Sequence, residues 1–376
     1  MKKIKIVNIV SRMIFGGVES VIYNYYSNMN LDKFELYIIT KNDYKTEAVE
    51  KFKKIGFKFI FVDDWEKNPR KVKKQLLEIF NKNRFDIIHS HLSHTNFYFM
   101  YLAYISKIPI RISHSHLSVK DKSIKDRIKH FIYKRLIWIF ATDFVACGKE
   151  AAKNLYNSNM NVVIFNNAID MEKYIYNNEI RKEYREKLKI QENSLCIGTI
   201  GRMTYQKNQE YLIDIFENIK DKNQDSKLII IGDGENKENL LSKISKMNLQ
   251  NDVIILENRN DVAQLLNVFD IFVLPSLYEG LPVVGIEAQA SGLKCFLSNN
   301  IDENVKLSDK CFFLSIKESP KVWSDFILKE SVYDREKMNE VIIRSGFSIK
   351  NEGKKLEKYY LSLYDRSCNN EKNGNY

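Results

Sequence analysis

Two carboxylates and a glycine turn lie close together in the segment 275–287, which reads PSLYEGLPVVGIE. The apolar run 270–274 before it is typical of a short buried strand, and 283–291 is typical of the helix that follows. Glu279 would then lie on the connecting loop, and Glu287 one to two turns into the helix. Ligands of parallel α/β sheets bind beyond the carboxyl ends of the strands, so both acids are expected beside a ligand.

The start of this predicted helix offers a place for an anion. The backbone N–H groups of Gly280, Leu281 and Val283 are expected to be free there, where they favour an anion or sugar hydroxyls. Pro282 suits a first helical turn because its N–H would have no partner in any case. Two acids beside such a helix start suit a nucleotide-sugar.

Two cations are predicted on a neighbouring strand-to-helix loop. The run 197–201 is typical of a strand, Arg202 follows its end, and Lys207 lies a few residues further on. Arg202 supplies a planar fork and Lys207 a point charge, which together can hold a diphosphate and stabilise its charge as it leaves. Surface cations are often only solvated, but the place at a strand end favours binding. With these cations nearby, Glu279 and Glu287 are better explained as binding groups than as the acid and base of a glycoside hydrolase.

A glycine pair, Gly16 and Gly17, follows the first predicted strand and precedes a helix. Glycine lets the backbone come close to a phosphate or sugar because no Cβ stands in the way. A tight strand-to-helix turn explains the pair equally well.

Five histidines follow two neighbouring strands of the first half: His89, His91, His94, His114 and His116. A metal site is one interpretation, but no matched set of acidic residues or cysteines accompanies them. A polar floor is the favoured interpretation, with His114 or His116 reaching a substrate. No Asp-x-Asp pair stands at a strand end, so no metal is expected.

The chain carries a net charge of +11, and much of it lies in the segment Val119–Arg135, with seven Lys or Arg against two Asp. Apolar residues recur through this segment at helical spacing and predict an amphipathic helix with a core face. They are Ile124, Ile128, Phe131, Ile132, Leu136 and Ile139. Either the basic face is simply solvated, or the helix also docks on an anionic membrane surface. Nucleic acid is the least favoured partner, because no recognition motif accompanies the charge.

The length of 376 residues indicates two domains. The 5 cysteines are scattered and show no disulfide framework or zinc spacing, which is typical of reduced thiols in a cytoplasm. The charged start before Ile6 predicts a first strand rather than a signal peptide. The longest apolar runs, 97–105 and 136–142, are too short to span a bilayer.

Apolar, β-branched runs alternate with helical patterns throughout, which indicates an α/β fold of two doubly wound parallel sheets facing a cleft. Seven strands are predicted in the first half, at 4–10, 34–40, 57–62, 85–91, 110–116, 143–148 and 161–165. Six are predicted in the second half, at 195–201, 227–232, 252–256, 270–275, 294–297 and 311–314. We expect one domain over 1–165, a second over 166–347, a last helix in 348–366 and a disordered tail from 367 to 376.

Five motifs occur in order along the chain: Gly16-Gly17-Val-Glu19, Gly201-Arg202 with Gln206-Lys207-Asn208, Ile231-Gly-Asp-Gly234, Arg259-Asn-Asp-Val, and Glu279-Gly-Leu-Pro through Glu287. In these motifs the chain resembles the family 4 retaining glycosyltransferases, and more narrowly the bacterial members that build exopolysaccharide and capsule repeat units. The resemblance covers nearly the whole chain. It implies the GT-B fold, with the last helix crossing back to the first domain.

The resemblance also implies roles for single residues in the second domain. Arg202 and Lys207 would hold the diphosphate of the donor. Glu279, with the backbone amides of Gly280 and Leu281, would contact the donor hexose, and Glu287 would hold the ribose hydroxyls. The leaving diphosphate oxygen is thought to take the acceptor proton on the same face, so that neither a protein nucleophile nor a metal is needed.

In the first domain, the resemblance places Gly16 and Gly17 against the donor phosphate and His114 beside the reacting sugar. His116 remains an alternative to His114 as the contact. The chain departs from the family pattern at 167–170, where Ala168 replaces a usual glycine, and after His116, where leucine stands for a usual asparagine.

These features predict a hexosyltransferase that uses a nucleotide-diphosphate sugar, with a UDP-sugar favoured, and a lipid-linked or polysaccharide acceptor. It is expected in the cytoplasm, on the inner face of the cell membrane, without a cofactor. Two alternatives stay open: a nucleotide-sugar epimerase of the same fold, and a non-catalytic subunit that docks on the membrane.

Overall fold

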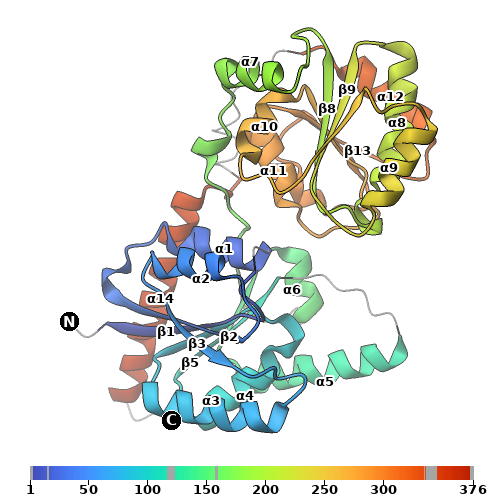
Figure 1. Ribbon diagram of the computed structural model, residues 1–376. Helices are drawn as coiled ribbons and strands as arrows, with labels where there is room; N and C mark the ends of the chain where they lie inside the picture. Colours follow the sequence, from blue (N-terminus) through green and yellow to red (C-terminus); the bar gives the residue numbers. More distant parts are fainter. Residues whose placement is uncertain are drawn as a thin grey trace. The chain divides into compact units, whose positions relative to one another are not determined.

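The structure of the protein is a computed structural model, shown in Figure 1. It describes residues 3–14, 17–116, 123–156, 160–333, 335 and 345–372. The chain divides into two compact units, the first formed by 1–168 together with 349–376, and the second by 169–348. The boundaries expected from the sequence lay at 165/166 and 347/348.

The first unit contains a seven-stranded parallel sheet in the order β3-β2-β1-β4-β5-β6-β7. Its strands are β1 (Ile4–Ile9), β2 (Phe34–Lys41), β3 (Lys58–Val62), β4 (Ile87–Ser90), β5 (Ile110–Ser115), β6 (Asp143–Ala146) and β7 (Val162–Ile164). Successive side chains of a strand point to opposite faces, so Ile4 and Ile6 enter one apolar core while Val7 and Ile9 enter the other. Both faces of the sheet are therefore buried, as continuous apolar strands predict.

Helices cover both faces of this sheet (Figure 1). They are α1 (Gly17–Tyr26), α2 (Thr46–Lys53), α3 (Pro69–Asn83), α4 (Asn96–Ile105), α5 (Ile124–Phe140), α6 (Lys149–Leu155) and α14 (Ile349–Lys372). The core that holds Ile6 also receives residues of α1, α2 and α14, and the core that holds Ile9 receives residues of α3, α4, α5 and α6. This division of helices between the faces is the doubly wound arrangement.

The second unit contains a six-stranded parallel sheet in the order β10-β9-β8-β11-β12-β13. Its strands are β8 (Leu195–Ile200), β9 (Ser226–Ile231), β10 (Val253–Leu256), β11 (Ile271–Leu274), β12 (Lys294–Ser298) and β13 (Cys311–Leu314). Its helices are α7 (Asn178–Lys187), α8 (Gln209–Lys222), α9 (Lys237–Lys246), α10 (Val262–Val268), α11 (Val283–Ala290) and α12 (Pro320–Glu330). All thirteen strands predicted from the sequence are confirmed, with ends that differ by two residues at most.

The strand order reverses once in each sheet, between β1 and β4 in the first unit and between β8 and β11 in the second. The loops that leave neighbouring strands on the two sides of such a point run in opposite directions, which opens a crevice at the carboxyl edge of the sheet. Each unit therefore has its own place for a ligand, at the ends of these four strands.

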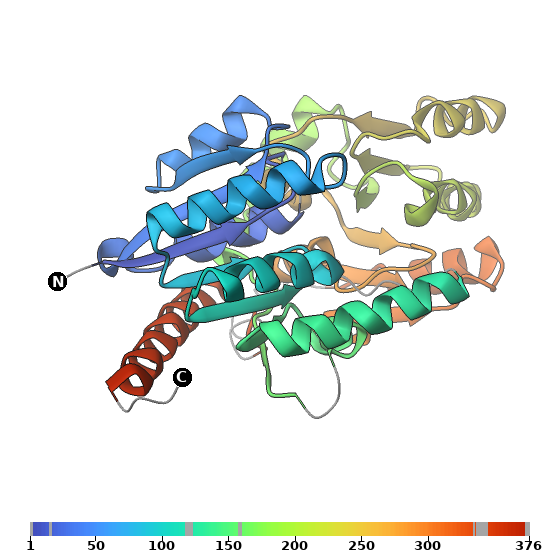
Figure 2. The ribbon, with the colours of Figure 1, turned by 90° about the horizontal axis from the view of Figure 1, so that it is seen from below.

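The C-terminal helix α14 is longer than the sequence predicted. It continues to Lys372, so the prediction of a disordered segment from residue 367 is wrong for 367–372. The apolar residues Leu356, Tyr360 and Leu363 anchor the helix in the core of the first unit, and Arg366 forms an ion pair of 2.8 Å with Asp143. A helix anchored along this length can extend through polar residues, because each further residue adds a backbone hydrogen bond. Figure 2 shows α14 in red along the first sheet.

The helix α5 packs with a different face from the one predicted. Ile137 is fully buried, Tyr133 stacks on Phe97 of α4, and His130 stacks on His94 at a ring-centroid distance of 3.9 Å. The prediction of a core face was wrong for Ile128, Phe131, Ile132 and Ile139, which are between 49% and 66% exposed. Aromatic and imidazole rings of the α4 region pack against the opposite side of α5, which leaves these apolar side chains in solvent. Residues 119–122 of the predicted basic segment lie outside the described residues, as do the side-chain contacts of Ile124.

Candidate functional site

The cation loop and the acid loop of the second unit form one hydrogen-bonded body. Lys207 ends the short 3-10 helix Tyr205–Lys207, and its Nζ forms an ion pair of 2.6 Å with Glu279 Oε1. Both side chains are largely buried, at 17% and 10% exposure. Ser276 Oγ donates a second hydrogen bond of 2.6 Å to the same carboxylate oxygen. The predicted meeting of a cation and an acid at this edge of the sheet is therefore present, and Ser276 is a partner that the sequence did not reveal.

Backbone contacts fix the two loops against each other. Leu277 N donates to Gln206 O at 2.8 Å, and Gln206 Nε2 donates to the carbonyl of Tyr278 at 2.9 Å. Asn208 Nδ2 donates to the carbonyl of Pro275 at 3.1 Å. These hydrogen bonds lie on both sides of Lys207 and Glu279 in the chain. They therefore fix the positions of the two loops and, with them, of the ion pair.

Three glycines allow the loop after β8 to pack tightly. A Cβ on Gly201 would lie 3.0 Å from Lys207 Cε, so the glycine makes room for the aliphatic part of the lysine. A Cβ on Gly232 would lie 2.0 Å from Gly201 O, and one on Gly234 would lie 2.4 Å from Met203 O. The glycine turn 232–234 therefore has a packing role, since it is the surface on which the loop that carries Arg202 rests.

Arg202 differs from Lys207 in its surroundings. Its side chain is exposed and makes no hydrogen bond or ion pair with the residues that the structure describes, while its backbone carbonyl accepts from Gln209 Nε2 at 3.0 Å. The loop thus carries one cation that is paired and largely buried and one that is open to solvent. An open guanidinium retains all its donors for an anion.

The start of α11 has no side-chain cap. Pro282 occupies the N-cap position, Gly280 is exposed and accepts from Asp302 N at 3.3 Å, and Leu281 packs partly buried against the core. The first N–H groups of a helix without a cap are available to an anion or to hydroxyl oxygens. Gly280 and Leu281 lie just before this helix start, and their contact with a ligand stays a prediction.

Glu287 lies one turn into α11 and is paired with a tyrosine. Tyr174 OH donates a hydrogen bond of 2.6 Å to Glu287 Oε1. Burial raises the pKa of the Glu287 carboxyl, and the bond from Tyr174 partly offsets that rise. Tyr174 stands 113 residues before Glu287, at the end of the 3-10 helix Met171–Tyr174, so only the fold brings the two together.

The histidines of the first unit form a buried stack at the carboxyl ends of β4 and β5. Ring centroids lie 4.2 Å apart for His89 and His91, 5.1 Å for His89 and His114, and 3.9 Å for His114 and His116. The predicted polar floor is therefore present with four of its five members. The fifth, His94, stacks instead on His130 of α5.

Hydrogen bonds link these imidazoles to one another and to neighbouring strands. His89 Nε2 lies 3.1 Å from His114 Nδ1, His91 Nδ1 lies 2.9 Å from His116 Nε2, and His91 Nε2 lies 3.1 Å from Oδ1 of Asn8 on β1. Burial lowers the pKa of His89 to about 3 and that of His116 to about 4, and holds the pKa of His91 and of His114 well below the ordinary value. The stack is therefore neutral at physiological pH.

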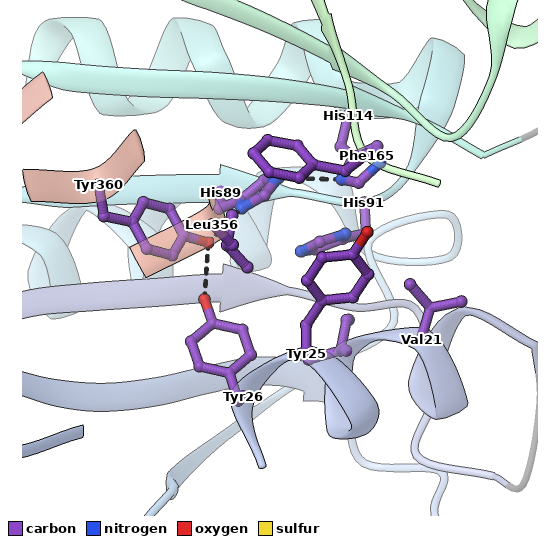
Figure 3. Close-up of a pocket in the computed structure, with 10 residues that line it drawn as sticks. Val21, Tyr25, Tyr26, His89, His91, His114, Phe165, Leu356 and Tyr360 are labelled. Carbon is purple, nitrogen blue, oxygen red and sulfur yellow. Dashed lines mark hydrogen bonds between the residues drawn. The ribbon is translucent and has the colours of Figure 1, made fainter. Parts of the chain in front are cut away.

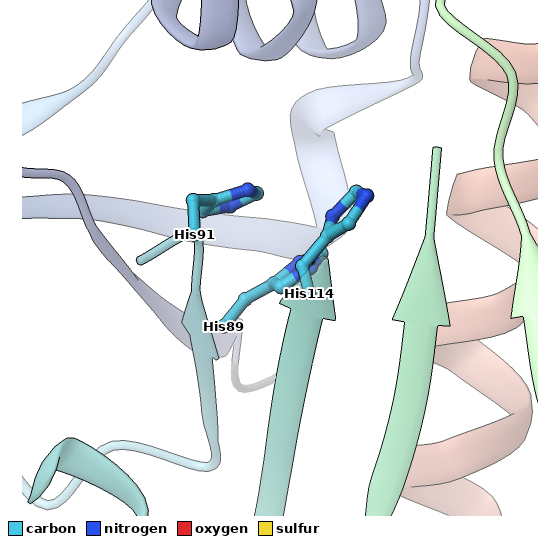
Figure 4. Close-up of side chains that lie close together, drawn as sticks. All are labelled: His89, His91 and His114. Carbon is cyan, nitrogen blue, oxygen red and sulfur yellow. Dashed lines mark hydrogen bonds between the residues drawn. The ribbon is translucent and has the colours of Figure 1, made fainter. Parts of the chain in front are cut away.

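One ring nitrogen from each of His89, His91 and His114 lies within 4.8 Å of the other two (Figure 4). Neutral imidazoles suit a transition metal, yet the nitrogens of His89 and His114 that face each other share a proton in a direct hydrogen bond. Such a pair can ligate one metal only after the rings turn out of that bond. Among the residues that the structure describes, this is the one group of three His, Cys, Asp or Glu side chains close enough to hold a metal ion.

The predicted glycine pair is described only in part. Gly16 lies outside the described residues, and Gly17 is the first residue of α1. A Cβ on Gly17 would meet no described atom within 4 Å. Packing among the described residues therefore does not require glycine at position 17.

A second candidate surface is the solvent side of α5. It joins the exposed apolar residues Ile128, Phe131, Ile132, Trp138 and Ile139 with the exposed cations Lys125, Arg127, Lys129 and Arg135. Arg135 lies over the ring of Trp138, with its Cζ 5.8 Å from the ring centroid. Within the described part of the chain, no helix has the length and apolar character that crossing a bilayer requires.

Comparisons with known proteins identify the family of this chain. A model described as Glycosyltransferase Family 4 matches residues 15–173, and one described as Glycosyl transferases group 1 matches residues 180–314. Together they cover both candidate binding regions and the switch point of the second unit, while β1 precedes the matched residues. The chain belongs to the family 4 glycosyltransferases.

Three relatives of this glycosyltransferase match over nearly their whole length. EpsF of Bacillus subtilis is 29% identical over 95% of this chain and 97% of its own. The UDP-Gal:alpha-D-GlcNAc-diphosphoundecaprenol alpha-1,3-galactosyltransferase of Escherichia coli is 27% identical over 96% of this chain and 97% of its own. The capsular polysaccharide biosynthesis glycosyltransferase CapH of Staphylococcus aureus is 25% identical over 96% of this chain and 99% of its own.

Solved structures show the same fold. A glycosyltransferase from Rickettsia africae superposes with a TM-score of 0.78 at 18% identity and covers 98% of this chain and 100% of its own. HepE from Anabaena, solved in complex with UDP, superposes with a TM-score of 0.74 at 14% identity and covers 98% of this chain and 100% of its own. The two Rossmann-like units of this glycosyltransferase therefore have the GT-B fold, as the sequence predicted.

Proposed function

We propose that this glycosyltransferase transfers a hexosyl unit from a nucleotide-diphosphate sugar to a lipid-linked or polysaccharide intermediate of bacterial exopolysaccharide or capsule synthesis, with retention of configuration and without a metal. The observation that carries the proposal is the pairing of Lys207 with Glu279 at the carboxyl edge of the second sheet, beside the open side chain of Arg202.

The second unit supplies groups for each part of such a donor. Lys207 and Arg202 hold the diphosphate, and the uncapped start of α11 at Gly280 and Leu281 faces oxygens of the same ligand. When a donor phosphate also contacts Lys207, Glu279 can accept hydrogen bonds from hexose hydroxyls. Glu287, kept in place by Tyr174, accepts the ribose hydroxyls.

A UDP-sugar is the favoured donor. HepE was solved in complex with UDP and with UDP-glucose, and the Escherichia coli relative is named for transfer from UDP-Gal. The name of that relative also supports a lipid-linked diphosphate as the acceptor. CapH is named for capsular polysaccharide biosynthesis, which supports the process in which the reaction takes place.

The proposed chemistry takes place on one face of the sugar. The bond between C1 and the leaving phosphate oxygen breaks, the acceptor oxygen bonds to C1 on the same face, and the acceptor proton passes to the leaving phosphate. Lys207 and Arg202 stabilise the negative charge that grows on the diphosphate during this step. In the first unit, His114, with His116 next to it, is the proposed contact to a sugar oxygen.

These cations are the reason for proposing that no metal is needed. Mg²⁺ at a diphosphate is held by carboxylate oxygens, whereas the close group of candidate ligands among the described residues consists of imidazoles in the first unit.

The transfer is tested with purified full-length protein, a panel of UDP-, GDP- and ADP-sugars, and an undecaprenyl-diphosphate-linked sugar as acceptor. At least one donor should give a labelled glycolipid, and Lys207→Ala and Glu279→Ala should each lower its rate by at least 100-fold. Lys227→Ala, which removes a lysine of the same unit paired with Asp252, is the matched control. Equal rates in all variants would overturn the assignment of the site, and conversion of the donor sugar without acceptor would identify an epimerase.

We further propose that the solvent side of α5 docks on an anionic lipid bilayer on the inner face of the cell membrane. The exposed isoleucines, phenylalanine and tryptophan of this side match the acyl boundary of such a surface, and the exposed cations beside them match its charged headgroups. The acceptor of the proposed reaction would be carried by the same bilayer.

Docking is measured by sedimentation with phosphatidylglycerol vesicles and with neutral phosphatidylcholine vesicles. Reversal of Lys125, Arg127 and Lys129 to Glu should release the protein from the anionic vesicles, and Phe131→Ser should weaken binding at high salt. The control reverses Lys317, Lys321 and Lys329, three exposed lysines of the second unit, and so changes the net charge equally. Unchanged binding of the α5 variants, or equal release by the control, would contradict docking through α5.

A further inference from the structure

A chain of buried hydrogen bonds runs from the C-terminal helix to His114 (Figure 3). Tyr26 OH on α1 lies 2.8 Å from Tyr360 OH on α14, and Tyr360 OH lies 2.6 Å from His89 Nδ1. His89 Nε2 lies 3.1 Å from His114 Nδ1. All four side chains are buried, and they come from α1, α14, β4 and β5 of the first unit.

The distances give the chain a direction. A separation of 2.6 Å is short for an N–H donor and ordinary for a hydroxyl donor, which favours Tyr360 as the donor to His89 Nδ1. His89 is neutral, because burial lowers its pKa to about 3, and its single proton is therefore on Nε2. That N–H donates to His114 Nδ1, which leaves the proton of neutral His114 on Nε2.

The other end of the chain is consistent with this direction. Tyr26 OH accepts from Asn8 Nδ2 at 3.0 Å and has two acceptors for its own proton, Asn8 Oδ1 at 3.1 Å and Tyr360 OH at 2.8 Å. The shorter contact is the one to Tyr360, which fits this direction. Asn8 Oδ1 in turn accepts from His91 Nε2, and His91 Nδ1 accepts from His116 Nε2. In this direction each hydroxyl and each neutral imidazole uses its proton once, and the contact of 3.1 Å between Tyr26 OH and Asn8 Oδ1 carries no proton.

The chain ends at a donor that has no partner. His114 is 4% exposed, and its Nε2 is buried without a hydrogen-bond partner among the described residues. His114 also lines a cavity of about 20 Å³, together with Tyr25, Phe165 and Leu356. That volume holds one water molecule or one hydroxyl oxygen. A buried N–H without an acceptor costs about 1–3 kcal/mol, which a substrate oxygen would recover.

We propose that Tyr360 is a positioning residue which, through His89, keeps the proton of His114 on Nε2, so that His114 donates a hydrogen bond to a sugar oxygen of the substrate. The choice of a sugar rests on the proposed function, whereas the chain from Tyr360 to His114 rests on the hydrogen-bond distances and on the neutral state of the buried histidines. The C-terminal helix thereby becomes part of the site, although Tyr360 follows His89 by 271 residues.

The tautomer is read from the nitrogen chemical shifts of isotope-labelled histidine in the full-length protein. In the wild type, His114 should show a protonated Nε2 and an unprotonated Nδ1. Tyr360→Phe keeps the ring but removes the donor to His89, so the His114 signals should shift toward a mixture of tautomers. The matched control is Tyr25→Phe, which removes a buried hydroxyl of the same cavity that bonds to the carbonyl of Asn166 instead. Its His114 signals should keep the wild-type tautomer.

A double-mutant cycle in the transfer assay gives the second readout. Tyr360→Phe should lower kcat about tenfold in the wild type and have no further effect in a His114→Ala background, because both changes remove one function. His114 nitrogen shifts that stay unchanged in Tyr360→Phe would overturn the inference, and so would an equal loss of kcat in both backgrounds. A wild-type protein that transfers no sugar would contradict the proposed function. The tautomer comparison would still test whether the hydrogen bonds from Tyr360 through His89 set the proton of His114.

Discussion

The polar regions at the carboxyl edges of the two sheets are built in opposite ways. In the first unit, four imidazoles, two phenols and an amide form a buried network that is neutral at physiological pH. All six histidines of the chain belong to this unit. In the second unit the same edge carries ionised groups, with Lys207 paired to Glu279 and Arg202 open to solvent.

The difference matches the two kinds of ligand in the proposed reaction. A diphosphate is charged and gains charge as it leaves, so fixed cations are the groups that bind it and assist its departure. A sugar hydroxyl is neutral and has to be held in one orientation, which a set of neutral donors and acceptors with fixed protons can do. The fold is the same in both units, and the function is set by the side chains at the strand ends.

The means of support differ too. Side-chain hydrogen bonds orient the imidazoles of the first unit. In the second unit, glycines let backbone loops lie directly on one another beneath Arg202 and Lys207. Three predictions follow this contrast from the largest expected effect to the smallest.

Acid should destabilise the first unit more than the second. The histidines of the stack have folded pKa values below their ordinary values, so the unfolded chain binds more protons as pH falls below about 6.5. The free energy of unfolding therefore decreases with falling pH, by about 2 kcal/mol at pH 5 for each histidine that stays neutral in the fold. Denaturant unfolding at pH 7 and pH 5 measures this loss.

Tryptophan fluorescence separates the two units in that experiment. Trp65 and Trp138 report on the first unit, and Trp323, which is fully buried, reports on the second. A variant that keeps only Trp65 should lose its transition at a much lower denaturant concentration at pH 5, whereas one that keeps only Trp323 should shift little. Equal shifts of the denaturant midpoint in both variants would contradict the proposed difference between a neutral region in the first unit and a charged region in the second.

Gly232→Ala should disturb the second unit. The added Cβ would lie 2.0 Å from a backbone oxygen, so the loop of Arg202 and Lys207 must move, with a loss of about 3 kcal/mol in the free energy of unfolding. Gly17→Ala at the start of α1 is the control, because no described atom lies near its Cβ, and it should change stability by less than about 1 kcal/mol. Similar stability of the two variants would argue against glycine-mediated packing as the support of the cation loop.

Tyr174→Phe should weaken nucleotide binding modestly. Loss of one hydrogen bond to Glu287 costs about 1 kcal/mol, which corresponds to about a fivefold higher Kd for the nucleotide. The pKa of Glu287 should rise further, so binding should also weaken more steeply as pH falls. Calorimetry at pH 7 and pH 6 compares this variant with Tyr184→Phe, whose hydroxyl bonds to Asp261. A Kd unchanged from the wild type would show that Tyr174 does not support the nucleotide site.

Much of the fold followed from the sequence, because parallel strands are buried on both faces and read as continuous apolar runs. The motif residues at strand ends, such as Arg202, Lys207 and Glu279, could be placed for the same reason. A strand end is a fixed point in an α/β fold, whatever the packing around it.

The sequence could not predict contacts that depend on packing between distant segments. Tyr174 and Tyr360 stand far from Glu287 and His89 in the chain and come next to them only in the folded unit. One signal was available for Tyr360, which lies at helical spacing between Leu356 and Leu363 on a polar helix. The exposed face of α5 was missed because apolar periodicity identifies a face without identifying what covers it, and here Phe131 and Ile139 lie in solvent.

The most direct test of the central claim is a calorimetric titration of UDP into the full-length protein and its Lys207→Ala variant. If the second unit binds a nucleotide diphosphate through the cation loop, the wild type should bind UDP with a Kd in the micromolar range. Lys207→Ala should then raise that Kd at least tenfold, a change of about 1.4 kcal/mol, while Lys227→Ala leaves it unchanged. Equal UDP affinity in Lys207→Ala and the wild type, or no binding of any nucleotide diphosphate, would contradict it.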